Sequence, residues 1–252
     1  LTEAEVRSII DNGIARARTA RAGIRRPLGS NMIVHVAVVD HNGDILGVFA
    51  MDDATVFSYD VAVQKARTCA FFSNEDVSFS CRAIGFLAQN FFPTGLEGPG
   101  GTEPPGPLFG LQSAFNPRPL RGIGLDSGVQ IFPGGLPIYR NGAVIGGIGV
   151  SGDGVDQDDL VAEAGAVGFE PPAAVRSDEA SDASIVNALQ EALTRIDQSI
   201  QNNTDPTLPA ANAQTISDAI DTSETRLDSQ QFRDSLSQLN LPYIKRPRNP
   251  DL

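Results

Sequence analysis

The N-terminal segment carries apolar residues three or four positions apart, which is the period of an amphipathic helix. This apolar stripe runs from Val6 to Ala20. Thr2 and Glu5 precede it in the arrangement of a capping box, in which both side chains accept hydrogen bonds from backbone N–H groups at the helix start. We therefore expect a first helix over about 2–20.

Two pairs of strand-like segments are each joined by an Asn-Gly dipeptide, the favoured sequence of a type I′ hairpin turn. The first segment is apolar except for one histidine, which is typical of a strand buried on both faces. The predicted strands are 33–39, 45–50, 136–139 and 143–150. Asn42-Gly43 and Asn141-Gly142 are the expected turns. Together these segments predict two antiparallel hairpins.

Further helices are predicted at 55–72, around 84–91 and at 156–167. The first of them is rich in alanine and valine, and such small side chains let a helix approach a sheet closely. The glycine-rich segment 146–154 superficially resembles a phosphate-binding loop, but it lacks the Gly-Lys-Ser/Thr sequence and follows a hairpin strand. We expect its glycines to permit close packing of a helix on the sheet.

Two parts of the chain differ from this pattern in their amino-acid composition. An insertion at about 77–127 is rich in phenylalanine, glycine and proline, and its phenylalanines could wall a flat apolar ligand or form a satellite core. The segment 171–252 is rich in Ser, Asp and Gln and carries three narrow helical stripes. Such stripes must pack on the core, on each other or on another subunit. We therefore divide the chain into a domain at 1–170 and a helical C-terminal extension.

Composition excludes some partners. The chain has 252 residues, of which 41% are hydrophobic, and its formal net charge is −12. A chain this acidic argues against a nucleic-acid partner, which requires a basic face, and the basic cluster at 245–248 is short. No apolar run is long enough to form a membrane span.

The cysteines and the charge bear on location. Cys69 and Cys81 lie 12 positions apart, and a disulfide between them would stabilise the fold by roughly 3 kcal/mol in the loop-entropy model. The acidic balance, the low lysine content and the absence of an initial Met favour export. We expect a secreted, periplasmic or cell-surface protein with a disulfide. The alternative is a cytoplasmic protein with two buried thiols.

Several blocks together resemble the GlcG/HbpS-like (DUF336) family, which also occurs as the C-terminal domain of some PduO proteins. The blocks are VAVVDHNGDILGVFAMDDA at 36–54, VAVQKARTCAFF at 61–72, GGLPIYRNGAVIGGIGVSG at 134–152 and DQDDLVAEAG at 156–165. The resemblance does not cover the insertion or the extension. It implies an α+β fold, an antiparallel sheet flanked by helices, usually assembled into dimers or larger rings. It also implies an association with haem, haem degradation, corrinoid enzymes or redox sensing.

Four residues are candidates for contact with haem or another tetrapyrrole. His41, in the first hairpin turn, is the candidate iron ligand, because imidazole commonly holds haem iron. His35 in the buried strand is a second candidate; it could equally be a hydrogen-bonded core residue. Lys65 should find an acidic partner or a pocket, because it lies in an apolar helix face. Either it contacts a haem propionate, or it forms a structural ion pair with Asp40 or Asp52.

Three functions follow from these observations. The first is an extracytoplasmic module that binds haem or a related tetrapyrrole, with His41, His35, Lys65 and Asp40 as cofactor-binding residues. The second is a structural or assembly subunit that uses its C-terminal helices to form a homo-oligomer or a larger complex. The third is an enzyme acting on haem or on a small hydroxy acid. It rests on the family association alone, because no Ser-His-Asp or Cys-His set can be assembled from two histidines.

Overall fold

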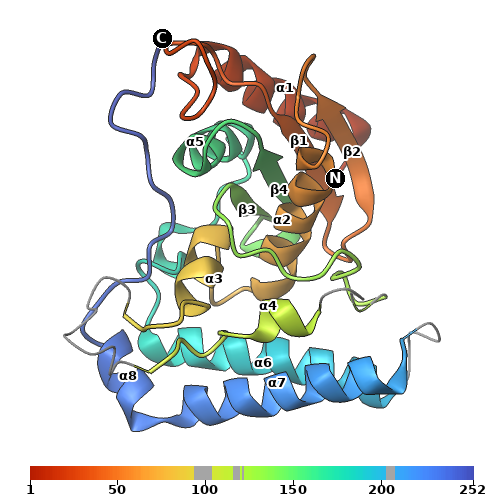
Figure 1. Cartoon of the computed structure of the whole chain (residues 1–252), viewed down its shortest axis with the longest axis vertical. Helices are drawn as coiled ribbons and strands as arrows, with labels where there is room; N and C mark the ends of the chain where they lie inside the picture. Colours follow the sequence, from red (N-terminus) through yellow and green to blue (C-terminus); the bar gives the residue numbers. More distant parts are fainter. Residues whose placement is uncertain (94–103, 116–119, 121, 203–207) are drawn as a thin grey trace.

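The centre of the protein is a four-stranded antiparallel sheet built from two hairpins, in the order β2-β1-β4-β3. The strands are β1 (His35–Asp40), β2 (Ile45–Ala50), β3 (Gly135–Arg140) and β4 (Ala143–Ser151). The computed structural model describes residues 1–93, 104–115, 120, 122–202 and 208–252. It confirms the expected α+β fold, an antiparallel sheet flanked by helices (Figure 1).

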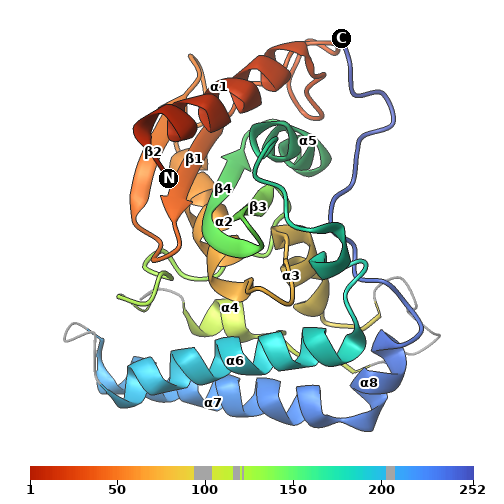
Figure 2. The ribbon, with the colours of Figure 1, turned by 180° about the vertical axis from the view of Figure 1, so that it is seen from behind.

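Helices cover both faces of the sheet. α1 (Glu3–Thr19) and α5 (Val155–Gly165) lie on one face and enclose a hydrophobic cluster with inward side chains such as Val36 and Ile148 (Figures 1 and 2). The predicted capping box is present at the start of α1, where Thr2 and Glu5 bond each other's backbone.

The other face carries α2 (Ser58–Phe72), which lies directly against β4. A Cβ atom on Gly149 would come within 1.9 Å of the Ala62 carbonyl oxygen, and one on Gly147 within 2.2 Å of the Ala66 carbonyl oxygen. Only glycine leaves room for a helix backbone at this distance. The packing role predicted for the glycine-rich segment is confirmed.

The two hairpin turns differ from each other. Asn141 and Gly142 have φ angles of 52° and 85°, as the predicted type I′ turn requires. In the first hairpin only Gly43 has a positive φ, of 84°, and the strand register shifts between Val38 and Val39. The prediction of a type I′ turn was wrong there, because the register shift leaves a three-residue loop, 41–43, closed by the backbone hydrogen bond from the Gly43 N–H to the Asp40 carbonyl oxygen at 3.1 Å.

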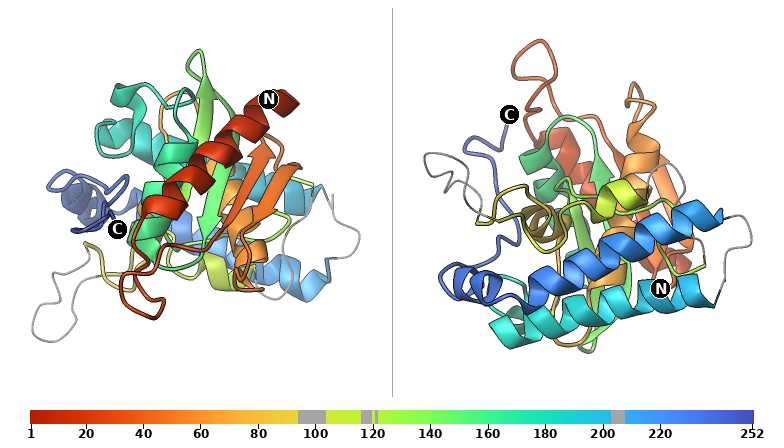
Figure 3. Two further views of the ribbon diagram at one scale, coloured as in Figure 1. Left: turned by 90° about the horizontal axis from the view of Figure 1, so that it is seen from above. Right: turned by 60° about the horizontal axis from the view of Figure 1, so that its bottom comes forward.

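The extension packs on its own domain. Its helices are α6 (Asp182–Gln201), α7 (Ala210–Asp228) and α8 (Gln230–Leu236), and α6 and α7 lie side by side along one end of the molecule (Figures 1 and 3). Between them and the sheet domain lie α3 (Cys81–Leu87), α4 (Leu111–Ala114) and the short 3-10 helix Ala173–Val175. The apolar stripes of the extension are therefore buried within the same chain.

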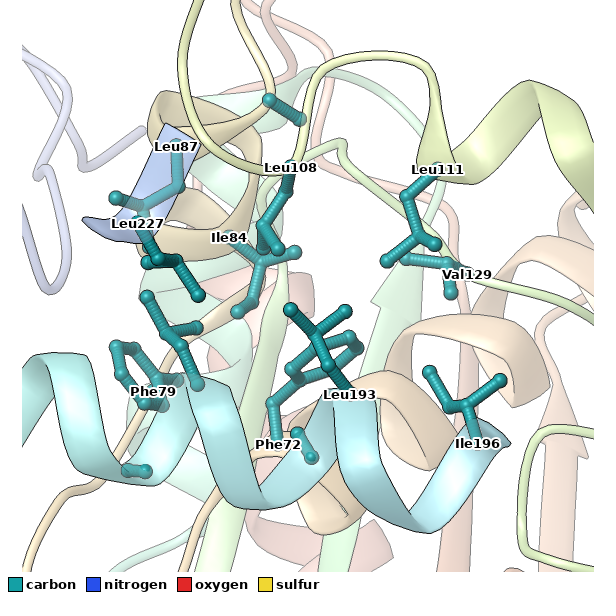
Figure 4. Packing of buried hydrophobic residues seen from close by; sticks show 14 of the residues in the cluster. Phe72, Phe79, Ile84, Leu87, Leu108, Leu111, Val129, Leu193, Ile196 and Leu227 are labelled. Carbon is teal, nitrogen blue, oxygen red and sulfur yellow. The ribbon is translucent and has the colours of Figure 1, made fainter. Parts of the chain in front are cut away.

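A second hydrophobic cluster joins the extension to the end of α2 and to the described part of the insertion. In Figure 4, Leu193 of α6 lies beside Phe72, and Ile196 points toward Val129. The insertion's phenylalanines at 79, 92 and 115 are no more than 2% exposed. They form a satellite core rather than the wall of an open ligand site. The run of Gly and Pro at 94–103 lies outside the described residues.

The last residues of the chain return from α8 along α5 to the end of α1 (Figure 1). Tyr243 is buried and its hydroxyl bonds that of Ser78 at 2.9 Å. Arg246 forms a salt bridge to Glu163. The backbone of Asp251 forms an isolated antiparallel β-bridge with the backbone of Ala20. The basic C-terminal cluster thus neutralises carboxylates of the protein's own α5. In the described part of the chain, no helix is long and apolar enough to cross a bilayer.

Candidate functional site

His41 lies at the tip of the first hairpin and is exposed. Within the part of the chain that the structure describes, its imidazole has no hydrogen bond or ion pair. Two exposed aliphatic side chains, Ile45 and Leu46, follow it on the same hairpin. Both ring nitrogens are therefore free to bind a ligand, next to an apolar surface.

The hairpin that presents His41 is held from three sides. The Asp40 carboxylate accepts hydrogen bonds from the backbone N–H groups of Asn42 and Asp44, both at 2.9 Å. Arg67 of α2 donates to the Gly43 carbonyl oxygen at 2.8 Å. Gly124 packs closely against Gly43. A Cβ atom added to Gly43 would come within 2.6 Å of the Gly124 Cα atom. Asp40 is therefore a turn-forming residue that holds the backbone of the turn that carries His41.

His35 is placed at the start of β1 and is 5% exposed. Its ring lies edge-on to Tyr59, with the ring centroids 6.0 Å apart, and its Nδ1 atom is buried without a partner. Burial lowers the pKa of this imidazole below its usual value, so the ring is neutral at pH 7.

The two histidines cannot bind one metal ion within a chain. His35 is the first residue of β1 and His41 follows its last, and a strand of six residues spans roughly 17 Å at 3.3 Å per residue. Of the two, only His41 offers an accessible imidazole. The described residues contain no group of three or more His, Cys, Asp or Glu side chains that could hold a metal ion.

Lys65 is buried in the middle of α2 and is 1% exposed. Its Nζ atom lies 2.9 Å from Asp158 Oδ2 and donates to the Val150 carbonyl oxygen at 2.6 Å. The expected partners, Asp40 and Asp52, were therefore wrong. The sequence alone does not identify Asp158 as the partner, because α5 lies far along the chain from α2. Only the folded sheet brings the first turn of α5 beside α2. Of the two roles considered for Lys65, the structure shows the structural ion pair.

Burial shifts the protonation of the carboxylates at the start of α5. It raises the pKa of Asp158 to about 6, although the nearby Lys65 ammonium opposes this shift. It also raises the pKa of Asp159, whose carboxylate accepts hydrogen bonds from Arg82 and from the backbone N–H of Gly134. These groups tie α5 to α2 and α3.

Cys69 and Cys81 are free cysteines in the structure, so the expected disulfide is not present. Their sulfur atoms lie 3.0 Å apart, and both residues are fully buried. Burial raises the pKa of the Cys69 thiol well above its usual value, which disfavours the reactive thiolate. The alternative of two buried thiols is the one that the structure shows.

The protein is a small α+β module built on two packed hairpins. It carries one imidazole on an exposed turn and a buried Lys–Asp ion pair, and its described residues contain no assembled catalytic set. A family model described as "Haem degrading protein HbpS-like" matches residues 1–167. The chain therefore belongs to the HbpS-like family.

Two curated proteins are similar to parts of this chain. An uncharacterized 15.0 kDa protein from the dhaT-dhaS intergenic region of Citrobacter freundii is 35% identical over 149 residues, which are 59% of this chain and 84% of the relative. The corrinoid adenosyltransferase PduO of the same organism is 28% identical over 143 residues. That match spans 57% of this chain but only 34% of the adenosyltransferase.

Two solved structures are similar to this chain at low identity. The Klebsiella pneumoniae protein ORFY is 24% identical with a TM-score of 0.44, and the match covers 67% of this chain and 90% of that one. A structure described as a PduOC:heme complex is 23% identical with a TM-score of 0.45, covering 66% of this chain and 93% of that one.

Proposed function

We propose that this chain binds haem or a related tetrapyrrole, with His41 as the iron ligand. The observation that carries the proposal is the exposed imidazole, which has no partner among the described residues, on a turn that Asp40 and Arg67 hold in place. Membership of the HbpS-like family supports haem as the ligand. A preorganised ligand loses less conformational entropy on binding than a mobile one.

The residues around His41 fit the iron and the apolar ring better than the propionates. A neutral imidazole is a common axial ligand of haem, and Ile45 and Leu46 provide exposed apolar surface beside it. Lys65 has no exposed surface to offer a propionate. The bound haem would supply iron redox chemistry, while this chain would supply the axial nitrogen and its fixed orientation.

A haemin titration followed in the Soret region tests this function. The wild-type protein should give a saturable band with one haem per chain, and His41→Ala should weaken binding by at least tenfold. His35→Ala is the matched control, because it removes the other imidazole at the far end of β1. Loss of the band in His35→Ala with no change in His41→Ala would transfer the ligand role to His35. No saturable band in the wild type would overturn the haem proposal.

We also propose that the protein works outside the cytoplasm. The acidic balance and the low lysine content of the sequence support this location. Fractionation of the native cells, with the protein detected by antibody, tests the proposal. Recovery with cytoplasmic markers alone would contradict it.

The assembly function receives less support from the extension than its sequence indicated. The apolar stripes of α6, α7 and α8 are buried against the protein's own insertion and α2. They are therefore not available to another subunit in this conformation.

A further inference from the structure

One stretch of this acidic chain is basic. The whole chain has a net charge of −12, but the residues at 12–39 include no Asp or Glu. The same stretch contains five arginines, at positions 16, 18, 21, 25 and 26. They lie in the last turn of α1 and in the loop that follows it. Positive charge is therefore concentrated in one short segment of the protein.

The loop after α1 has a defined shape. The backbone N–H of Ala22 donates to the Ser30 carbonyl oxygen at 2.9 Å, and Arg21 forms an antiparallel β-bridge with Asn31. The Ser30 hydroxyl donates to the Pro27 carbonyl oxygen at 2.6 Å. In both views of Figure 3 the loop projects from the body of the molecule beside the C-terminus. These bonds close the base of the loop and leave its tip, residues 24–29, at the surface.

Two aliphatic side chains at this tip are exposed. Ile24 and Leu28 are 71% and 76% exposed. Arg25, between them, is instead anchored to the body, because its guanidinium lies 2.7 Å from both Asp153 Oδ2 and Asp53 Oδ2. A single exposed aliphatic residue is ordinary, but two on one projecting loop provide an apolar contact surface.

Cations without a counter-charge surround this tip. Arg18, Arg21 and Arg26 are exposed and form no ion pair with any of the described residues. Arg248 is also exposed and unpaired within that part of the chain, and its segment lies beside the loop, because the Arg21 N–H donates to the Pro250 carbonyl oxygen at 2.9 Å. The face therefore carries free positive charge next to apolar side chains.

The acidic neighbours of the loop are largely neutralised. Asp53 and Asp153 both pair with Arg25, and Asp251 pairs with Arg16 at 2.8 Å. Asp52, next to Asp53, is exposed and subtracts one charge from this face. The unpaired arginines outnumber it, so the face remains positive.

We propose that this loop attaches the protein to the surface of a bilayer that contains anionic phospholipid. Ile24 and Leu28 enter the boundary between headgroups and acyl chains, and the arginines contact lipid phosphates. Basic residues beside exposed apolar ones are the combination that binds such an interface. A nucleic acid would contact the arginines through its phosphates but would leave the two aliphatic tips in water. The proposal does not depend on haem binding.

The overall negative charge does not prevent this attachment. At physiological ionic strength the Debye length is about 8 Å, so charges farther than this from the bilayer are largely screened. A molecule oriented with the loop toward the lipid brings its positive face within that distance and keeps most of its carboxylates outside it. The attachment should therefore weaken as the salt concentration rises.

Cosedimentation of the full chain with vesicles tests the proposal. The protein should bind vesicles of phosphatidylcholine with phosphatidylglycerol and should not bind phosphatidylcholine alone. Arg21→Gln with Arg26→Gln should weaken the binding by about tenfold or more. Arg7→Gln with Arg233→Gln is the matched control, because it removes the same charge from exposed sites elsewhere and should leave the binding unchanged.

A single tryptophan reports on the apolar part of the contact, because the chain has none of its own. The emission of Leu28→Trp should shift to the blue when anionic vesicles are added. That of Val167→Trp should not shift, since Val167 is exposed beyond the end of α5, away from the loop. All of these substitutions are at exposed side chains, and circular dichroism checks that each variant is folded.

Three outcomes would overturn the proposal. The first is no binding to anionic vesicles, including the case in which the protein binds DNA or an acidic polypeptide instead. The second is equal loss of binding in the two pairs of arginine variants, because binding would then follow the total charge and not this face. The third is an unchanged Leu28→Trp emission on the vesicles, which would show that the loop tip stays in water.

Discussion

Lys65 and Asp158 form a buried ion pair that joins the middle of α2 to the first turn of α5, with the Nζ and Oδ2 atoms 2.9 Å apart. Both side chains are at most 4% exposed. The Nζ atom also bonds the last part of β4 through the Val150 carbonyl oxygen, whereas Asp158 Oδ1 has no partner. The pair thus links two helices and a strand at one point inside the domain.

Removing the cation alone should destabilise the fold. Lys65→Met leaves Asp158 buried without its counter-charge, and we expect a loss of about 3 to 5 kcal/mol in the free energy of unfolding. Adding Asp158→Asn should recover most of that loss, because the remaining side chain is neutral. Urea denaturation of both variants provides the measurement. Equal stability of the single and double variants would contradict the ion-pair account.

The same pair predicts a pH dependence of stability. The pKa of Asp158 is about 6 in the folded protein and near 3.8 when unfolded, mainly because burial disfavours the carboxylate. Between these values the folded state holds a proton that the unfolded state has released, so the free energy of unfolding should fall as pH rises from about 4 to 6. The expected fall from this group is roughly 1–3 kcal/mol. It should be absent in Asp158→Asn, measured by urea denaturation across that range.

Local sequence predicted the local structure well. The capping box of Thr2 and Glu5, the second hairpin turn and the glycines facing α2 all depend on neighbouring residues or on periodicity. The sequence could not identify Asp158 as the partner of Lys65, because the two are 93 positions apart and meet only across the folded sheet. For the same reason it left open what the extension would contact.

The glycines of β4 offer a paired test of close packing. Gly149→Ala would place a methyl group 1.9 Å from the Ala62 carbonyl oxygen, so α2 must shift, and we expect a loss of about 1–3 kcal/mol or more. Gly13 in α1 is the control, because a Cβ atom there meets its neighbours at an ordinary 3.6 Å. Gly13→Ala should leave stability unchanged or raise it by up to about 1 kcal/mol. Equal thermal midpoints for the two variants would argue against close packing.

The number of free thiol groups can be measured directly with a thiol reagent. Because both thiols are fully buried, the folded protein should react slowly with a thiol reagent such as dithionitrobenzoate. After unfolding in guanidinium without a reductant, two thiols per chain should react. Finding none after unfolding would show that the protein carries the disulfide that this structure lacks.

The most direct test of the central claim, that His41 holds haem iron, is the rescue of a cavity variant by free imidazole. His41→Gly should bind haem with a changed Soret band, and added imidazole should restore the wild-type spectrum by replacing the missing side chain. His35→Gly should keep the wild-type spectrum without imidazole. If His41→Gly already has the wild-type spectrum, His41 is not the iron ligand.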